Sequence, residues 1–332
     1  MTKMTKRERV LAALRGEEVD RVPVSFWGHD FLREWTAEGL AEAMLDSVRT
    51  YEYDYLKVNP RTTYFSEAWG CRYRPSGDDV HSPEVVSWTL HEASDLDAVE
   101  PVDVRAGAFG EQLEALRLIG TGLGGDVPFV QTVFSPLSVV SRMANGQEPV
   151  KRWMVEAPDA LHKALTAVTE TLASYSQACI EAGAGGIFFA TTEWGTRDVC
   201  SNDEYDAFGR RYDVRVLEAV QGAPFNVLHV CRPNNMLYDL LDYPAAAVNW
   251  AMHAPGNASL ADALTKMDKA VMGGIDERHA LLTGSPGDVR AQAQEALRQT
   301  DGRRFLLAPG CSIPPQTPPG NIRAAVDAAR GA

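Results

Sequence analysis

Short runs of apolar residues alternate with longer amphipathic stretches along almost the whole chain. The runs are rich in β-branched or aromatic residues and are bounded by Gly, Pro or Asp, as is typical of buried parallel strands. They occupy residues 22–27, 54–59, 127–134, 185–191, 225–231, 245–250, 269–275 and 305–310. Eight such runs alternating with helices predict a (β/α)8 TIM barrel of the α/β class.

The amphipathic stretches carry helix start and stop signals. The longest, residues 157–183, has Pro158 near its beginning and Gly183 at its end, which suits a helix with a fixed first turn and a left-handed stop. Further helices are predicted within residues 1–20, 107–119, 201–220, 285–300 and 317–330. Each of the last two follows one of the last two strands, in keeping with the barrel repeat.

The main alternative is a doubly wound open sheet. The glycine-rich "GTGLGGD" at 120–126 precedes a predicted strand, whereas a nucleotide-binding loop would follow one, so we interpret it as a plain loop. Residues 60–105 do not fit the barrel repeat and are predicted to be a hairpin-like insertion after the second strand. We therefore expect residues 1–332 to form one barrel domain, with an N-terminal helix within 1–20.

The composition limits which binding partners and which cellular compartment are expected for the protein. The 332 residues carry a net charge of -13, which argues against nucleic acid as a partner because phosphate binding needs a basic surface. No apolar run reaches the ~18 residues needed to span a bilayer, so no membrane segment is expected. Five cysteines, an odd number, do not form a disulfide framework. A reducing cytoplasm is therefore predicted, where thiols are free to bind metal.

The stretch "NVLHVCRPNN" (226–235) places an imidazole and a thiol at the end of a predicted strand. Side chains alternate along a strand with period two, so His229 and Cys231 point to the same face. Cys311 follows the eighth run and should lie at the same mouth of the barrel. Imidazole and thiolate are the ligands that zinc prefers, and three of them leave a fourth position open. The alternative is three unrelated buried residues, the usual fate of a lone cysteine.

Other polar and aromatic side chains are predicted at the same mouth. Glu193 and His253 are the catalytic candidates: Glu193 as a proton acceptor or further ligand, and His253 as a displaceable fourth ligand. A solvated loop charge and a residue at a helix start are the respective alternatives. Substrate contacts are predicted for Trp27, His29, Lys57, Asn59, Arg232, Asn249 and Asp276. Each also has a structural alternative, such as a core aromatic, an ion pair or a helix cap.

Three motifs resemble a known family. "RERVLAALRGEEVDRVPVSFW" resembles the opening of the uroporphyrinogen decarboxylase superfamily. "LHVC", then "VMGGID" and "LLAPGCSIPPQTPPGNIRAAVDAAR", are similar to its cobalamin-dependent methyltransferase branch. The resemblance implies a (β/α)8 barrel. It also implies a zinc site formed by a His-x-Cys pair and a distant Cys, which match His229, Cys231 and Cys311.

The chain departs from the family pattern at two places. Porphyrin decarboxylases carry an arginine-rich motif after the first strand, but this chain has "SFWGHDFLREW" there, with Arg33 later and predicted on a helix. Porphyrin decarboxylation is therefore not expected. Many relatives have glycine after the second metal-binding residue, where this chain has Arg232. That cation suggests a substrate with an anionic group.

These observations predict a zinc-dependent methyltransferase. It would move a methyl group between a corrinoid on a separate protein and a small thiol or a methylated substrate. The first alternative is a metal-independent decarboxylase or lyase of a non-porphyrin acid, using Lys57, Arg232, Glu193 and Asp276. The second is a non-enzymatic barrel that docks a corrinoid protein. The oligomeric state is left open, with a homodimer as one option.

Overall fold

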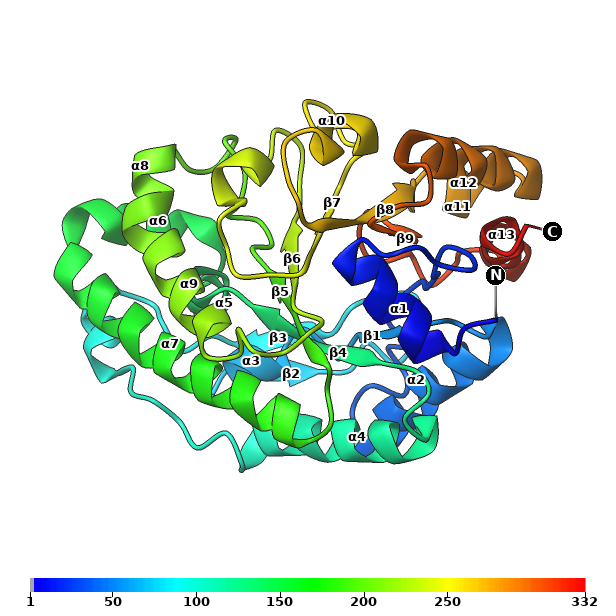
Figure 1. The fold of residues 1–332 in the computed structure, drawn as a ribbon. Helices are drawn as coiled ribbons and strands as arrows, with labels where there is room; N and C mark the ends of the chain where they lie inside the picture. Colours follow the sequence, from blue (N-terminus) through cyan, green and yellow to red (C-terminus); the bar gives the residue numbers. More distant parts are fainter. Residues whose placement is uncertain (1–2, 332) are drawn as a thin grey trace.

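The computed structural model describes residues 3–331, and at its centre is a curved sheet of seven parallel strands surrounded by helices (Figure 1). In spatial order the strands are β1 (Leu56–Val58), β4 (Phe129–Phe134), β5 (Gly186–Ala190), β6 (Val227–Val230), β7 (Ala247–Trp250), β8 (Ala270–Ile275) and β9 (Phe305–Pro309). Every residue of these strands is buried, as their continuous apolar runs predict. The chain has a TIM-barrel-like α/β fold.

The first predicted strand, residues 22–27, is reduced to a single bridge, and the expectation of a regular eighth strand is corrected here. Val24 bridges Leu307 of β9 in parallel, and the Leu307 N–H donates to the Pro23 carbonyl over 2.9 Å. On the other side the Asp54 N–H donates to the Val24 carbonyl over 3.0 Å. The segment thus lies between β9 and β1. Pro23 has no amide hydrogen to donate, which interrupts a regular ladder at this point.

Helices cover the outer face of the strands (Figure 1). The longer ones are α1 (Lys6–Arg15), α2 (Ala37–Tyr51), α4 (Gly107–Leu123), α5 (Pro136–Met143), α6 (Gln147–Glu156), α7 (Pro158–Glu181), α9 (Arg211–Glu218), α12 (Pro286–Thr300) and α13 (Pro319–Ala329). Shorter helices are α3 (Tyr64–Glu67), α8 (Asn202–Tyr205), α10 (Leu260–Leu264) and α11 (Ala280–Thr283). Short 3₁₀ or π-helical elements are η1 (Ala93–Ala98), η2 (Asp206–Arg210) and η3 (Leu237–Leu240).

Three predicted helices differ from the expectation in extent. The helix predicted at 107–119 continues to Leu123, so the first part of the glycine-rich segment 120–126, interpreted from sequence as a loop, is helical. The N-terminal helix is shorter than residues 1–20, because Thr5 caps its beginning and Gly16 ends it in the left-handed conformation (φ 73°). The helix predicted at 201–220 is divided into α8 and α9 by η2, a π-helical turn. None of these changes alters the alternation of strands and helices.

The segment between β1 and α4 carries a second, separate sheet. Its two strands, β2 (Arg72–Arg74) and β3 (Glu84–Ser87), pair antiparallel. Leu90 then bridges Ala144 at the end of α5, which ties this segment to the barrel.

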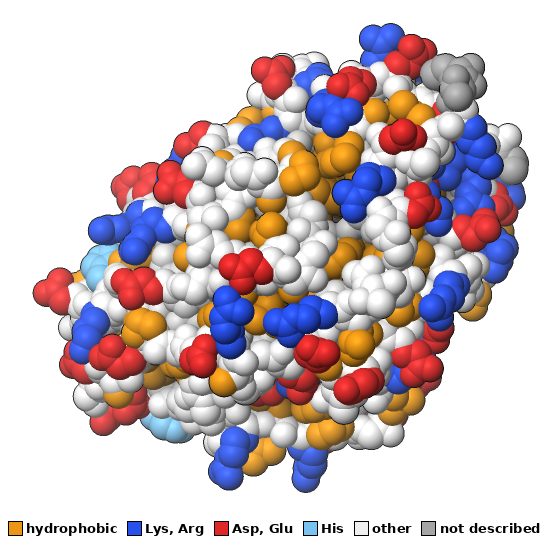
Figure 2. All heavy atoms as spheres, turned by 60° about the horizontal axis from the view of Figure 1, so that its bottom comes forward, with side chains coloured by type: hydrophobic (Ala, Val, Ile, Leu, Met, Phe, Trp, Pro, Cys, Tyr) orange, Lys and Arg blue, Asp and Glu red, His pale blue; other side chains and the backbone are white. Residues whose placement is uncertain are grey.

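The surface carries both signs of charge. On the face shown in Figure 2, acidic and basic side chains are interspersed. The net charge of -13 is therefore not gathered into one patch on this face. Among the described residues, no helix is long and apolar enough to cross a bilayer.

Candidate metal centre

Three potential metal ligands meet at the carboxyl ends of the barrel strands. His229 lies in β6, Cys231 directly follows β6, and Cys311 comes two residues after the end of β9. Their ligand atoms all lie within 4.8 Å of one another. The two sulfur atoms are 3.7 Å apart. The structure therefore brings together, at the barrel mouth, three residues that are up to 82 positions apart in the chain.

The His229 ring is oriented by Asn249, its register partner on β7. The Asn249 amide nitrogen donates to two backbone carbonyls, those of Met272 (2.9 Å) and Pro309 (3.0 Å). The Asn249 oxygen is then an acceptor, and it lies 2.5 Å from His229 Nδ1. Nδ1 must carry the hydrogen, so Nε2 keeps a free lone pair. This arrangement prepares the imidazole to bind a metal through Nε2.

The two thiols differ in acidity because they lie so close together. The hydrogen bond from Cys231 is the main cause that holds the pKa of Cys311 well below its usual range, despite burial. The pKa of Cys231 is raised well above its usual range by its hydrogen bond to Cys311 and by burial. One thiolate at Cys311 is therefore favoured, and a cation is needed before both thiols ionise.

This donor set fits zinc. Two sulfur ligands of a tetrahedral zinc, each about 2.3 Å from the metal, are about 3.8 Å apart, and the observed separation is 3.7 Å. An imidazole nitrogen completes a set of three soft or borderline ligands. Among the described residues no further His, Cys, Asp or Glu joins this cluster, which leaves a fourth position for water or substrate.

Arg232, immediately after Cys231, has a left-handed backbone with φ 73°. This conformation favours glycine, so an arginine here carries local strain. Asn257 donates to the Arg232 carbonyl over 2.8 Å and holds the turn. The arginine side chain is exposed, and its charge only partly offsets the rise in the pKa of Cys231. Arg232 thus lies beside the ligands, at the solvent side of the site.

The two predicted catalytic residues lie outside the cluster of ligand atoms. Glu193 follows β5 and faces Arg142 across a 3.9 Å ion pair. His253 follows β7, and its Nε2 lies 3.3 Å from the Gly274 carbonyl oxygen. Both side chains therefore have protein partners in this structure, and their catalytic roles stay predictions.

At the end of β8 the structure separates two neighbouring carboxylates. Asp276, predicted as a substrate contact, accepts from the backbone N–H groups of Arg278 (2.8 Å) and His279 (2.9 Å), so it stabilises a turn. Glu277, which sequence reasoning missed, points toward Gly310: a Cβ added there would lie 3.2 Å from the Glu277 carboxylate. Burial and the charge of Cys311 raise the pKa of Glu277 to about 7. Its only sequence signal is its position just after a barrel strand.

The remaining predicted substrate contacts divide into buried and partly open residues. Asn249 is fully buried with every polar atom paired, which favours its role in orienting His229 over substrate contact. Lys57 and Asn59 are buried at the end of β1 and are hydrogen-bonded to each other. Trp27 packs edge-on against Phe188, with ring centres 5.5 Å apart.

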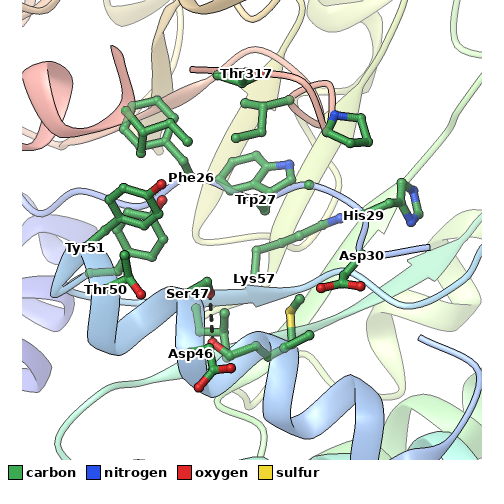
Figure 3. A pocket seen from close by; sticks show the side chains of 18 of the residues that line it. Phe26, Trp27, His29, Asp30, Asp46, Ser47, Thr50, Tyr51, Lys57 and Thr317 are labelled. Atoms are coloured by element: carbon green, nitrogen blue, oxygen red, sulfur yellow. Dashed lines mark hydrogen bonds between the residues drawn. The ribbon is translucent and has the colours of Figure 1, made fainter. Parts of the chain in front are cut away.

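His29 lies close to Trp27 at the rim of the barrel. Its Nδ1 is 2.8 Å from a Glu34 carboxylate oxygen, and its ring stacks on Phe31 with centres 4.9 Å apart. The ring lines a cavity of about 370 Å³ that also reaches Lys57 (Figure 3).

Known proteins match the chain over nearly its whole length. The family model for uroporphyrinogen decarboxylase (URO-D) matches residues 5–332. The chain belongs to the uroporphyrinogen decarboxylase family. The motifs at both ends of the sequence had suggested this membership, and the barrel agrees with it.

Within the family, the chain is similar to corrinoid methyltransferases. It is 27% identical over 342 residues to a methylcobamide:CoM methyltransferase, MtaA of Methanosarcina barkeri, covering 99% of this chain and 98% of that protein. A solved methyltransferase from Methanosarcina mazei superposes with a TM-score of 0.84 at 26% identity, covering 99% of both chains. These relatives support methyltransferase activity in this chain.

A third relative shares the fold. A B12-independent methionine synthase from Shewanella sp. W3-18-1 superposes with a TM-score of 0.65 at 14% identity, covering 93% of this chain and 97% of that one. At this identity the likeness extends to the fold alone.

Proposed function

We propose that this chain is a zinc-dependent methyltransferase that moves a methyl group between a corrinoid on a separate protein and a small thiol. The observation that carries the proposal is the cluster of His229, Cys231 and Cys311, whose ligand atoms lie within 4.8 Å of one another. The similarity to methylcobamide:CoM methyltransferases over 99% of the chain supports the corrinoid and the thiol. Such chemistry needs free thiols and suits a reducing cytoplasm.

The residues of the site would divide the work as follows. His229, Cys231 and Cys311 would hold the metal, and Asn249 would fix the imidazole tautomer. Zinc in this position would keep a bound acceptor thiol deprotonated near neutral pH. Glu277, whose pKa is raised to about 7, is suited to accept the proton that the thiol releases. The aromatic wall formed by Trp27 and Phe188 would exclude water.

The direct test is elemental analysis of protein purified without chelator. We expect about one zinc per chain, with a steep loss in Cys311→Ser and His229→Ala. Cys200→Ser is the control, because Cys200 is also a free thiol but is buried outside the cluster. Wild-type protein without any transition metal would contradict the proposal. Methyl transfer from free methylcobalamin to a thiol then tests the activity and separates an enzyme from a docking barrel.

The alternative is a metal-independent lyase, because the family model that matches the chain is that of a decarboxylase. Two of its four predicted residues have other partners: Asp276 accepts backbone hydrogen bonds, and Glu193 faces Arg142. The arginine after the first barrel segment, Arg33, lies in a turn and not on the predicted helix, and it is paired with Asp30 at 2.8 Å. We therefore expect no conversion of uroporphyrinogen to coproporphyrinogen. An enzymatic rate of that reaction would favour the lyase.

A further inference from the structure

The two thiols of the candidate metal centre are in contact across the mouth of the barrel. Cys231 follows β6 and Cys311 follows β9, although β7 and β8 lie between these strands in the sheet. The sulfur atoms are 3.7 Å apart. Because a disulfide bond is about 2.05 Å long, the sulfurs need to approach each other by only about 1.7 Å to form one.

The sheet leaves the two side chains free to make this movement. The last residues paired in the sheet are Val230 on β6 and Pro309 on β9, so both cysteines lie beyond the paired part of their strands. Rotation about the Cα–Cβ bonds therefore moves the sulfurs without disturbing the barrel. The new bond would join residues that are 80 positions apart in the chain.

The other three cysteines are not available for this reaction. Cys71, Cys179 and Cys200 are buried, whereas Cys231 and Cys311 are partly exposed. Within residues 3–331, the sulfur contact between Cys231 and Cys311 is the only one that joins two cysteines. Burial raises the pKa of Cys200 to about 12, so this residue stays a thiol, the unreactive form. A small oxidant that enters the mouth therefore meets a single reactive pair.

A metal ion and a disulfide would compete for the same two sulfurs. In a tetrahedral zinc site the sulfur ligands are about 3.8 Å apart and each is bonded to the metal, so neither is free to bond to the other. A disulfide, in turn, has no thiolate to offer a metal. It would leave His229 as the only intact member of the ligand cluster. The two states therefore exclude each other.

We propose that Cys231 and Cys311 form a reversible disulfide when hydrogen peroxide reaches the metal-free site, and that this bond switches the site off. The switching role rests on the proposed function, whereas the bond itself needs only the two thiols. One thiol attacks a peroxide oxygen, becomes a sulfenic acid and releases water. The second sulfur then attacks the sulfenic sulfur, the S–S bond forms, the S–O bond breaks and a second water leaves. Two thiols thus lose two electrons to one peroxide, and a small thiol reverses the bond by exchange.

The test uses full-length protein that is freed of metal with a chelator and kept reduced until hydrogen peroxide is added. We expect two of the five thiols to disappear, with a mass decrease of two hydrogen atoms and no covalent dimer. Peptide mapping should recover a disulfide between Cys231 and Cys311. The oxidised protein should take up no zinc by elemental analysis, and dithiothreitol should restore both the thiols and the uptake. A stoichiometric amount of zinc, added before the peroxide, should protect the two thiols.

Two variants and the wild type together decide the outcome. Cys231→Ser should gain oxygen on its remaining mouth thiol and form no disulfide, whereas Cys200→Ser should lose the same two thiols as the wild type. If Cys231→Ser misfolds, the peptide map of the wild type still decides. Five surviving thiols in the metal-free wild type, or a disulfide between another pair, would overturn the inference and leave the zinc site untouched. Equally fast oxidation with and without zinc would contradict the proposed metal site and the switching role that rests on it.

Discussion

Buried polar side chains gather at both ends of the barrel, but they are paired in different ways. At the amino ends of the strands, called the floor below, Asp54 precedes β1 and is fully buried. Its two carboxylate oxygens accept from Arg9 (2.8 Å), from Arg21 (2.6 and 2.8 Å) and from the Val24 N–H (3.0 Å). Every acceptor on this carboxylate is therefore used by the protein itself.

The mouth keeps its polar groups available. His229 Nε2 has its lone pair free, and the Cys231 and Cys311 thiols face each other across 3.7 Å. Asn59 Nδ2 and one Glu34 carboxylate oxygen are buried without partners.

The contrast fits a structural network at the amino ends of the strands and the proposed ligand site at their carboxyl ends. Satisfied ion pairs at the amino ends of the strands stabilise the fold, whereas the groups without protein partners at the carboxyl ends are available to a ligand. Substitutions at the floor should therefore cost stability, and substitutions at the mouth should cost function.

The largest effect is expected at the mouth. Cys311→Ser should reduce methyl transfer by more than about 100-fold, beyond the 10- to 100-fold typical of losing an outer partner of a ligand. Chemical denaturation of the metal-free forms should show little change, because serine is nearly isosteric with cysteine and can keep the hydrogen bonds to Cys231 and to the Ser312 backbone. A large loss of metal-free stability would mean that the mouth is structural like the floor.

The floor should show the opposite behaviour. Asp54→Ala removes a buried carboxylate that Arg9 and Arg21 share and should lower the free energy of unfolding by about 3–5 kcal/mol, because Arg21 loses its charge partner and buried Arg9 keeps only Asp20. Metal content of the folded fraction should be unchanged. Loss of zinc from well-folded Asp54→Ala protein would break the division between the two ends.

A substitution of Asn249 tests whether a buried polar residue at the mouth affects metal binding more than stability. Asn249→Ala should weaken zinc binding by about 10- to 100-fold, since His229 loses the acceptor that fixes its tautomer. The matched control is Asn226→Ala, just before β6. Asn226 is also buried, and its side chain bonds the Ile187 N–H and the Val220 carbonyl. The control should lower stability but leave the metal affinity, measured by chelator competition, unchanged.

The floor should also be the acid-sensitive end. Hydrogen bonds from Arg9 lower the pKa of Asp20 from 3.8 to about 2. A carboxyl group whose pKa is lowered by folding stabilises the folded state at pH values above its pKa in the unfolded chain. That stabilisation is lost as the pH falls from about 4 through about 2. The loss should be at most about 2 kcal/mol, measured by denaturation at a series of pH values. Asp20→Asn should flatten the dependence of the free energy of unfolding on pH in this range. An unchanged pH dependence would mean that Asp20 does not contribute to the stability of the floor.

The smallest effect is expected at Arg232. Its φ of 73° favours glycine, so Arg232→Gly should relieve local strain and change stability by no more than about +1 kcal/mol. Thermal unfolding of the two proteins measures this directly. A clear destabilisation would show that the arginine side chain makes a stabilising contact at the mouth.

Much of this protein was determined by the sequence alone. Apolar runs bounded by Gly, Pro or Asp located all seven strands of the barrel sheet, because buried parallel strands need continuous apolar residues. The motifs at the two ends indicated the family. His229 and Cys231 were predicted to share a face from the period of a strand, and Cys311 from its position after the last run. Local patterns sufficed for these features.

Only the tertiary structure decided the rest. A local pattern could not show that Pro23 leaves residues 22–27 as a single bridge, or that Glu277 faces the site while Asp276 stabilises a turn. Nor could it show that Asn249 orients His229 from the neighbouring strand, or that Lys57 is buried without a carboxylate partner. These features depend on which side chains from distant segments meet, and on the hydrogen bonds left over once the barrel has closed.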